Sequence, residues 1–412
     1  MNKSDSERIR TVFEKLDFGE VGSVDKADFV VINACSVRQT AIDRIWGLLE
    51  QFRNLKKKKK LVTILTGCLL EKDKKNLGKK FDFVFNIKEL GKLRSFLSKN
   101  NLRTEKDYFQ VSPKYSSRFQ AFVPIMTGCN NFCSYCVVPY ARGREVSRSV
   151  RSVLAEIKRL AQNGCQEVCL LGQNVNSYLP KDIGFFSKKN PFKHNFARLL
   201  WEVNQIEGIE RLNFVAAHPK DMTDEVIRAM GLSKQMNYIH LALQSGDDDV
   251  LRAMNRKYTT ADYFKIIKKI RQIRSDIAIG TDIIVGFPGE TKKQFENTLK
   301  FYKKVGFDIS FHARYSPRYG TASAKLVDNV SRLEKKKRWQ AAQSLMEDIT
   351  LKKNQKYLNK QVSVLIDQAG KSFVEGNSSE MKRVRVKNVD YKIGDIVQTK
   401  ICEAKTWILI GE

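Results

Sequence analysis

The sequence predicts an α/β protein in three parts: a small parallel α/β domain, a partial (β/α)6 barrel and a small antiparallel β-barrel. The chain has 412 residues, which is enough for more than one hydrophobic core. Short apolar runs recur through its middle, each followed by enough chain for a helix. From Gln361 onward the pattern changes to short alternating strands. These three observations set the expected order of domains.

Residues 1–103 predict the small parallel α/β domain. Apolar side chains recur at the spacing of one helix face over residues 4–16, so a helix is expected there. Three short strands are expected at 29–33, 61–66 and 81–85, with helical stretches between them. Residues 104–120 lose this periodicity and indicate a linker.

Residues 121–350 predict the partial barrel. The six expected strands are 121–126, 166–171, 212–216, 238–243, 278–285 and 308–315. Their ends carry polar residues or glycine, in the order TGC, GQN, HP, QSG, GFPGE and SPR. Active sites of such barrels form from the loops after the strands' carboxyl ends. We therefore expect these six endings to line one cavity.

Residues 355–412 predict the C-terminal β-barrel, after a charged helical stretch at 332–358. The runs QVSVLID, KRVRVKN, DIVQTKICEA and TWILIGE alternate in the manner of short antiparallel strands. The second run carries Lys382, Arg383 and Arg385, which suit contacts with RNA phosphates. An ordinary solvent-exposed strand is the alternative explanation.

The charge balance favours a nucleic-acid partner. Lysine and arginine number 74 against 45 acidic residues, a formal net charge of +29. A generally lysine-rich composition is the alternative explanation of this excess. The polar start MNKSDSERIR lacks the apolar core of a signal peptide, and no run is apolar enough to span a membrane. We expect no membrane partner and a cytoplasmic location.

The cysteines indicate metal or redox use, because disulfide frameworks are unusual in cytosolic chains of this size. Three of the eight, Cys129, Cys133 and Cys136, lie within eight residues in C-x3-C-x2-C spacing. No further Cys or His lies nearby to complete a tetrahedral zinc site. A four-iron cluster held by three thiolates would keep one iron open for a small-molecule ligand. Zinc binding, or cysteines brought together by chance, is the alternative.

The cysteine loop, with the aromatic Tyr135 before its third cysteine, resembles the radical S-adenosylmethionine superfamily. The resemblance implies that the open iron binds S-adenosylmethionine and that an electron from the cluster cleaves it to a 5′-deoxyadenosyl radical. It also implies a cofactor cradle at the strand ends. The expected cofactor-binding residues are Tyr135, Gln173, Asn174, Gln244, Ser245 and Asp282.

Further runs narrow the resemblance to the methylthiotransferases. These are VVPYARGREVSRS, LLGQNVNSY, HLALQSGDDDVLRAMNRKYT and GTDIIVGFPGET. The first two resemble the branch that acts on N6-dimethylallyladenosine in transfer RNA. The C-terminal barrel is similar to the family's TRAM RNA-binding module, and residues 1–103 to its auxiliary-cluster domain. Two positions depart from the family pattern, Ala242 and Tyr319, where proline is usual.

Cys35 and Cys68 each directly follow an expected parallel strand, in INACS and LTGCL. Neighbouring strands lie about 4.8 Å apart, so the two sulfurs can meet at the sheet's carboxyl edge. Two buried core cysteines would explain the spacing equally well. The family resemblance implies that both are ligands of a second, auxiliary four-iron cluster, which supplies or carries the transferred sulfur.

The expected function is therefore methylthiolation of N6-dimethylallyladenosine, next to the anticodon of transfer RNA. By resemblance it uses two molecules of S-adenosylmethionine, two iron–sulfur clusters and an electron donor that the sequence does not identify. The alternatives are methylthiolation of threonylcarbamoyladenosine in transfer RNA or of a ribosomal-protein aspartate. An RNA-binding iron–sulfur protein without catalysis is the alternative from another class.

The third auxiliary ligand of the family has no counterpart among the remaining cysteines. The start MNKSDSERIR resembles the segment just after that ligand, where a strand runs into GCQMN. We expect the true start to lie upstream. The chain as given is then expected to hold the auxiliary cluster weakly and to transfer little sulfur.

Overall fold

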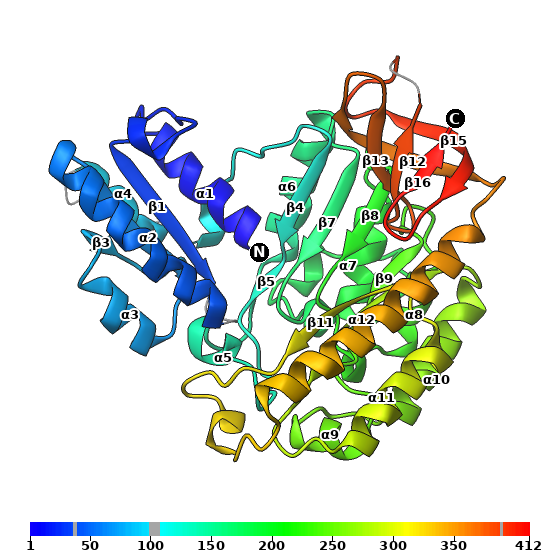
Figure 1. The fold of residues 1–412 in the computed structure, drawn as a ribbon. Coiled ribbons are helices and arrows are strands. Elements are labelled where there is room, and N and C mark those ends of the chain that lie inside the picture. Colours follow the sequence, from blue (N-terminus) through cyan, green and yellow to red (C-terminus); the bar gives the residue numbers. More distant parts are fainter. Residues whose placement is uncertain (36–38, 99–107, 388–389) are drawn as a thin grey trace. The chain divides into compact units, whose positions relative to one another are not determined.

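The computed structural model describes residues 1–35, 39–98, 108–387 and 390–412 (Figure 1). The chain forms two compact units. Unit 1 comprises residues 1–117, 127–148 and 316–325, and unit 2 comprises 118–126, 149–315 and 326–412. Unit 1 thus contains every cysteine predicted to bind a cluster. The domain boundaries expected from the sequence remain predictions, and residues 104–107 of the expected linker lie outside the described part.

Unit 1 is built around a parallel sheet in the order β1-β2-β3. Its strands are β1 (Phe29–Cys35), β2 (Val62–Cys68) and β3 (Phe83–Val84). Its main helices are α1 (Asn2–Glu14), α2 (Gln39–Lys58), α3 (Glu71–Gly78) and α4 (Leu90–Ser98). The small parallel α/β domain predicted from the sequence is confirmed. Both long strands extend two residues further than expected, as far as Cys35 and Cys68.

Helices cover both faces of this sheet. Successive strand residues point to opposite faces. Ile64 packs with Ile9 of α1 and Leu90 of α4, and all three are buried. Its neighbour Leu65 packs in a second cluster with Ile42 of α2. The strand is apolar on both faces because each face buries its side chains against helices.

The core of unit 2 is a curved parallel sheet. Its strands are β4 (Gln120–Pro124), β7 (Glu167–Leu171), β8 (Arg211–Phe214), β9 (Tyr238–His240), β10 (Ala278–Val285) and β11 (Ile309–Arg314). They form two parallel sheets, β4-β7-β8 and β9-β10-β11. Isolated parallel bridges link the chain at and just after β8 to residues that flank β9, one pairing Leu212 with Gln235 and one pairing Ala217 with Leu241. The six-stranded partial barrel is therefore confirmed.

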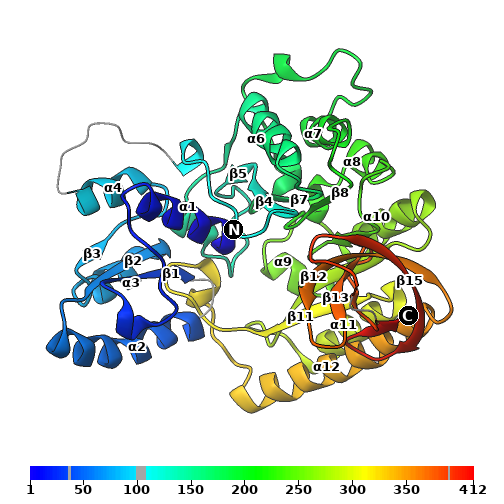
Figure 2. The same cartoon turned by 90° about the horizontal axis from the view of Figure 1, so that it is seen from above.

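The helices of unit 2 follow the strand order around the outside of this sheet (Figure 2). They are α6 (Val150–Gln162), α7 (Asn195–Asn204), α8 (Asp224–Ala229), α9 (Asp248–Ala253), α10 (Thr260–Ile273), α11 (Lys292–Val305) and α12 (Arg332–Gln355). Capping boxes start α10 at Thr259 and α11 at Thr291, where each threonine accepts a backbone hydrogen bond. This local chemistry fixes where the connection between α9 and α10 ends, and where the loop after β10 ends.

The C-terminal strands close into a five-stranded barrel in the order β12-β13-β14-β16-β15. They are β12 (Gln361–Ala369), β13 (Val374–Ser378), β14 (Arg383–Val386), β15 (Ile396–Ala404) and β16 (Leu409–Gly411). The expected barrel is confirmed, with one difference. β14 and β16 pair in parallel, because an odd number of strands cannot alternate in direction all the way around a closed barrel.

The C-terminal barrel packs against the amino-terminal ends of the unit 2 strands. Arg211, at the start of β8, donates hydrogen bonds to the carbonyl oxygens of Asn377 (2.9 Å) and Ser378 (2.8 Å). Gln166, just before β7, donates to the carbonyl of Gly394 at 2.7 Å. The opposite, carboxyl ends of the strands carry the expected cofactor residues. Among the described helices, none is both long and apolar enough to cross a membrane.

Candidate functional site

The cysteine triplet lies on the loop between β5 (Met126–Thr127) and α5 (Val138–Ala141). The loop begins at Gly128, whose φ is +83°. A Cβ at this position would lie 2.0 Å from the carbonyl oxygen of Arg144, so only glycine fits. The backbone N–H of Cys129 donates to the carbonyl of Gly143 at 3.1 Å, and that of Cys136 to Cys133 at 2.9 Å. The loop is thus closed at its base.

Side chains around the triplet hold the loop further. Cys129 and Cys133 are buried, and Cys136 is half-buried. Phe132 has a φ of +47°, which is uncommon for a non-glycine residue. The Arg144 guanidinium lies 4.5 Å from the centre of the Phe132 ring. Together these contacts set the direction in which the neighbouring cysteines leave the backbone.

The donor set of this loop fits a four-iron cluster. Within the described residues, no group of three or more His, Cys, Asp and Glu side chains is arranged to hold a single metal ion. A cluster takes each thiolate on a separate iron, so its ligands surround it without converging on one point. The buried hydroxyl of Thr127, two residues before Cys129, has no hydrogen-bond partner in the part of the chain described. A structural zinc ion would require a fourth ligand that the loop lacks.

Cys35 and Cys68 are paired in register. They are the last residues of β1 and β2, and they face each other across the parallel pair. The sequence predicted that these sulfurs would meet at the carboxyl edge of the sheet, and the register agrees. Gly67 has a φ of +109°, and a Cβ there would lie 2.2 Å from the Ala34 carbonyl oxygen. The strands approach so closely at this edge that glycine is required before Cys68.

Arg142 contacts Cys68 and was not found by sequence reasoning. It follows α5, and its Nε donates to the Cys68 Sγ at 2.8 Å. Its Nη2 donates to Asp5 Oδ2 at 2.5 Å, and both side chains of this ion pair are buried. Burial alone lowers the pKa of Arg142, but Asp5 and Cys68 together raise it above its usual value. Burial raises the pKa of the Cys68 thiol, and Arg142 opposes that rise.

In unit 2, Gln173 and Asn174 follow β7, as expected. Asn174 is buried; its Nδ2 donates to Asp221 Oδ2 at 2.7 Å, while its Oδ1 has no partner among the described residues. Two residues on, Asn176 exchanges two 2.9 Å hydrogen bonds with the backbone of His218. The loops after β7 and β8 are thus fixed to each other. An orphaned buried acceptor at Asn174 is compatible with a ligand donor.

His218 is a structural member of this pair of loops. Burial, reinforced by Arg256 and Lys220, lowers the pKa of His218 to about 2, so the ring is neutral at physiological pH. Its Nδ1 accepts a hydrogen bond from the backbone of Lys220 at 3.2 Å. The ring therefore acts as an acceptor within the loop.

Gln244 and Ser245 follow β9. Gln244 has a φ of +75°, and its backbone bridges β10 through the carbonyl of Asp282 (2.8 Å) and the N–H of Ile284 (2.9 Å). A strained non-glycine residue held on both sides is typical of a functional loop. Ser245 is fully buried and its Oγ lies 3.3 Å from Thr298 Oγ1. Its role in binding the cofactor remains a prediction.

Asp282 lies in β10 and is paired with His240 at the end of β9. Asp282 Oδ2 lies 2.9 Å from His240 Nε2, and His240 Nδ1 lies 3.2 Å from the Tyr238 hydroxyl. Asp282 keeps 42% of its side chain exposed. A Cβ at Gly280 would lie 2.1 Å from the Tyr238 hydroxyl. Glycine at this position therefore leaves space for the hydrogen bond between Tyr238 and His240. The carboxylate remains accessible to a ligand on this face.

The three basic residues expected to contact RNA form ion pairs within unit 2. Lys382 is buried, and its Nζ lies 3.2 Å from Asp308. Arg383 pairs with Asp367 at 2.6 Å and with Glu375 at 3.1 Å, and Arg385 pairs with Glu375 at 2.8 Å. Arg385 is the most exposed of the three, at 42% of its side chain. Their role toward RNA remains a prediction.

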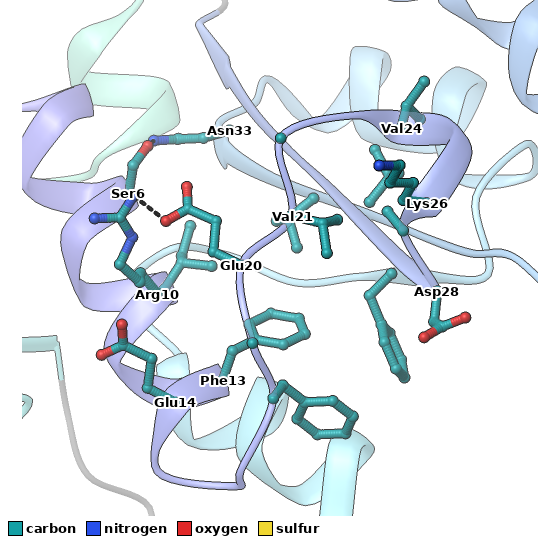
Figure 3. Close-up of a pocket in the computed structure, with 18 of the residues that line it drawn as sticks. Ser6, Arg10, Phe13, Glu14, Glu20, Val21, Val24, Lys26, Asp28 and Asn33 are labelled. Atoms are coloured by element: carbon teal, nitrogen blue, oxygen red, sulfur yellow. Dashed lines mark hydrogen bonds and ion pairs between the residues drawn. The ribbon is translucent and has the colours of Figure 1, made fainter.

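A cavity of about 880 Å³ lies away from all of these residues, between α1, the loop at residues 17–28 and the start of β1. Figure 3 shows Phe13, Val21 and Glu20 around it, with an ion pair between Arg10 and Glu20. Its lining contains no cysteine and no expected cofactor-binding residue. We therefore assign the candidate functional site from the positions of the cysteines and not from this cavity.

Comparison with known proteins agrees with this chemistry. Residues 123–302 match the Radical SAM superfamily, and residues 1–87 match the uncharacterized protein family UPF0004. The tRNA-2-methylthio-N(6)-dimethylallyladenosine synthase of Caldicellulosiruptor saccharolyticus is 42% identical over the whole of this chain and 90% of its own length. The chain belongs to the radical S-adenosylmethionine methylthiotransferase family. The same-named proteins of Clostridium novyi and Finegoldia magna are 38% and 37% identical over the whole chain and cover 94% and 92% of their own lengths.

Solved structures share the fold. The radical S-adenosylmethionine methyltransferase TsrM from Kitasatospora setae superposes with a TM-score of 0.56 at 13% identity, over 78% of this chain and 73% of TsrM. The cobalamin-dependent S-adenosylmethionine radical enzyme OxsB superposes with a TM-score of 0.53 at 11% identity, over 84% of this chain and 53% of OxsB. At these identities the likeness concerns the fold alone.

Proposed function

We propose that this chain methylthiolates N6-dimethylallyladenosine in transfer RNA, using S-adenosylmethionine and iron–sulfur clusters. The observation that carries the proposal is the full-length relationship to synthases of that name, together with the cysteine triplet that their chemistry requires. The in-register Cys35 and Cys68 provide a second set of thiols in the same unit. A partner that supplies electrons is also required.

The cysteines of unit 1 form two sets with different proposed roles. Cys129, Cys133 and Cys136 would hold the four-iron cluster that binds S-adenosylmethionine, and Cys35 and Cys68 would contribute to the auxiliary cluster. When bound, these groups supply the electron transfer and the sulfur that amino-acid side chains cannot. The chain itself positions the thiols through the close turns at Gly67 and Gly128.

The residues of unit 2 are proposed to bind the organic part of the cofactor. Asn174 offers a buried carbonyl oxygen without a partner among the described residues, and Asp282 offers an exposed carboxylate. An amide oxygen and a carboxylate accept hydrogen bonds from ammonium, hydroxyl or amino groups. Gln244 has a left-handed backbone conformation and forms backbone hydrogen bonds with β10. These bonds fix the loop after β9. Gln173 and Ser245 remain predicted cofactor-binding residues of unit 2, and Tyr135 remains a predicted cofactor-binding residue of unit 1.

The nucleoside product tests the proposal. Deleting the corresponding gene from its native strain should remove 2-methylthio-N6-dimethylallyladenosine from the transfer RNA of that strain. Mass spectrometry of the digested transfer RNA measures the nucleoside directly. Loss of a 2-methylthio derivative of threonylcarbamoyladenosine instead, or loss of the modification of a ribosomal protein, would show that the substrate is misassigned. A second measurement tests whether the chain is an enzyme. If the protein binds RNA but yields no 5′-deoxyadenosine after anaerobic reconstitution and reduction, it does not catalyse the proposed reaction.

Binding of transfer RNA through the C-terminal barrel is a further prediction. Replacing Arg385 with alanine should weaken RNA binding and flatten its dependence on salt, because one fewer phosphate contact releases fewer counterions. Lys382→Ala should change the salt slope less, because Lys382 is buried against Asp308. Filter binding at several salt concentrations measures both slopes. Identical slopes for Arg385→Ala and the unsubstituted chain would show that this face is solvated surface only.

A further inference from the structure

Phe311 is an exposed aromatic residue in the middle of β11, with 52% of its surface accessible. Its neighbours along the strand bond to the outer helices. Ser310 Oγ lies 2.9 Å from the Tyr302 hydroxyl of α11, and His312 Nδ1 lies 3.3 Å from Gln343 Oε1 of α12. Successive strand residues point to opposite faces, so Phe311 points away from these helices, to the inner face of the curved sheet (Figure 2).

The inner face around Phe311 is apolar apart from one carboxylate. β10 and β11 run in parallel, and residues that are paired in register share a face of the sheet. The pairs on this face are Gly280 with Ile309, Asp282 with Phe311, and Ile284 with Ala313. Asp282 is the charged member of these pairs. A ligand on this face therefore meets aliphatic and aromatic carbon beside a single negative charge.

His240 of β9 lies beside the Phe311 ring. The two ring centres are 5.9 Å apart. His240 Nδ1 lies 3.2 Å from the Tyr238 hydroxyl and its Nε2 lies 2.9 Å from Asp282 Oδ2, so both ring nitrogens are engaged. The imidazole is thus fixed next to Phe311, while about half of the Phe311 surface stays accessible. A large exposed apolar side chain in such surroundings is typical of a ligand contact.

The chemistry of the proposed substrate matches this face. The proposed reaction adds a methylthio group at C2 of an adenine whose N6 carries a dimethylallyl group. Both positions belong to the same ring, so a site that holds the reacting base also holds the N6 group. Dimethylallyl is a branched apolar chain, whereas threonylcarbamoyl and aspartate each end in a carboxylate. A carboxylate on this face would lose water and would meet Asp282, which carries the same charge.

We propose that Phe311 is a specificity-determining residue whose ring contacts the dimethylallyl group of the substrate adenosine. The inference rests on the proposed function in that the substrate carries this group. Burial of the apolar chain against the ring favours it over an unsubstituted N6, and the apolar face disfavours substituents that end in a carboxylate. Asp282, proposed above to bind the cofactor, lies in register beside Phe311. The base and the cofactor are then neighbours, as the reaction requires.

RNA binding to the full chain tests this contact without the reaction. Three anticodon stem-loop RNAs of one sequence carry adenosine, N6-dimethylallyladenosine or threonylcarbamoyladenosine next to the anticodon. Fluorescence anisotropy gives the dissociation constant of each RNA, with no reductant present so that no turnover occurs. The unsubstituted chain is compared with Phe311→Ala and Phe311→Leu. The measured quantity is the ratio of the dissociation constants for the adenosine and dimethylallyladenosine RNAs.

Phe185 provides a matched control. It is 52% exposed, as Phe311 is, but it lies in the loop after β7, in the short helical turn Ile183–Phe185. There the Arg151 guanidinium lies 5.5 Å from the centre of its ring. Phe185→Ala therefore removes an equally exposed ring from another part of unit 2. A general effect on RNA affinity in this variant changes both dissociation constants and leaves their ratio unchanged.

We expect the unsubstituted chain to bind the dimethylallyladenosine RNA about 10–100-fold more tightly than the adenosine RNA, the range for added apolar carbon at an apolar site. Phe311→Ala should lose most of this preference and keep its affinity for the adenosine RNA, which also shows that it is folded. Phe311→Leu should keep part of the preference, and it preserves the test if the alanine variant does not fold. The threonylcarbamoyladenosine RNA should bind no more tightly than the adenosine RNA.

Two results overturn the proposal: no preference for the dimethylallyladenosine RNA in the unsubstituted chain, or an undiminished preference in Phe311→Ala. The proposed function fails separately. If gene deletion leaves the methylthiolated nucleoside in place while the preference still depends on Phe311, the proposed function is wrong and the role of Phe311 stands. If deletion removes the nucleoside and the preference does not depend on Phe311, the role of Phe311 is wrong and the proposed function stands.

Discussion

Replacing Cys133 with alanine is expected to abolish both 5′-deoxyadenosine formation and methylthiolation. Cys133 is the central thiol of the triplet and is buried in the loop after β5. Loss of an outer partner of a metal ligand already costs about 10–100-fold, so loss of the ligand itself should cost more. Two thiolates then remain for a cluster that needs three. Chromatographic measurement of 5′-deoxyadenosine after anaerobic reconstitution and reduction gives the result directly.

Cys169→Ala is the matched control for this substitution. Cys169 is as buried as Cys133 but lies in β7, and burial raises the pKa of its thiol to about 12. It is therefore a protonated core residue. Replacing Cys169 with alanine should lower the free energy of unfolding, because it removes a buried sulfur atom from the core. Cleavage of S-adenosylmethionine should continue in this variant. Cleavage that survives in Cys133→Ala, or is lost equally in Cys169→Ala, would contradict the assignment of the triplet.

The sequence predicts the parts of the fold that depend on local patterns. The β-branched runs at residues 29–33 and 61–66 mark two strands of unit 1, and the six barrel strands follow from the same signal. Register follows too, because Cys35 and Cys68 each end a parallel strand and parallel neighbours place their ends together. Two strands were missed. β6 (Val146–Ser147) has only two residues, and β13, with the sequence VEGNS, contains a glycine and does not alternate in polarity.

The part of the site that depends on distant residues is not visible in the sequence. Asp5 and Arg142 are 137 residues apart, and charged side chains such as these are mostly exposed in folded proteins. Only folding shows that both are buried and that Arg142 reaches Cys68. One signal was present, because an arginine six residues after a metal-binding motif is a candidate to support its ligands. Spacing alone could not show which cysteine it contacts.

The same limit explains the basic residues of the C-terminal barrel. Arg383 and Arg385 lie two residues apart on β14, which indicates a charged face, and Lys382 directly precedes the strand. Their acidic partners come from other elements, Asp308 before β11 and Glu375 on β13. A cation paired inside the protein must break that pair before it contacts a phosphate. The net charge of the chain therefore indicates a nucleic-acid partner. Only the structure shows which basic side chains are unpaired enough to contact its phosphates.

Substituting Cys35 with alanine is expected to stop sulfur transfer while leaving cofactor cleavage near the rate of the unsubstituted chain. Cys35 ends β1 and faces Cys68, and neither belongs to the loop that carries Cys129, Cys133 and Cys136. The radical cluster keeps all three of its thiolates in this variant. The auxiliary cluster loses a thiolate and should lose most of its iron, because each missing ligand leaves one iron without protein anchorage.

The decisive measurement for Cys35→Ala is the ratio of two products in one reaction. Methylthiolated nucleoside and 5′-deoxyadenosine are quantified together, so that a general loss of folded protein lowers both and leaves their ratio unchanged. Cys68→Ala should give the same low ratio, since it removes the facing thiol of the pair. Cys402→Ala, which removes an exposed cysteine of β15, should keep the original ratio. A Cys35→Ala variant in which cleavage and sulfur transfer fall equally would refute the separation of the two thiol sets, because it would show that Cys35 supports the radical cluster itself.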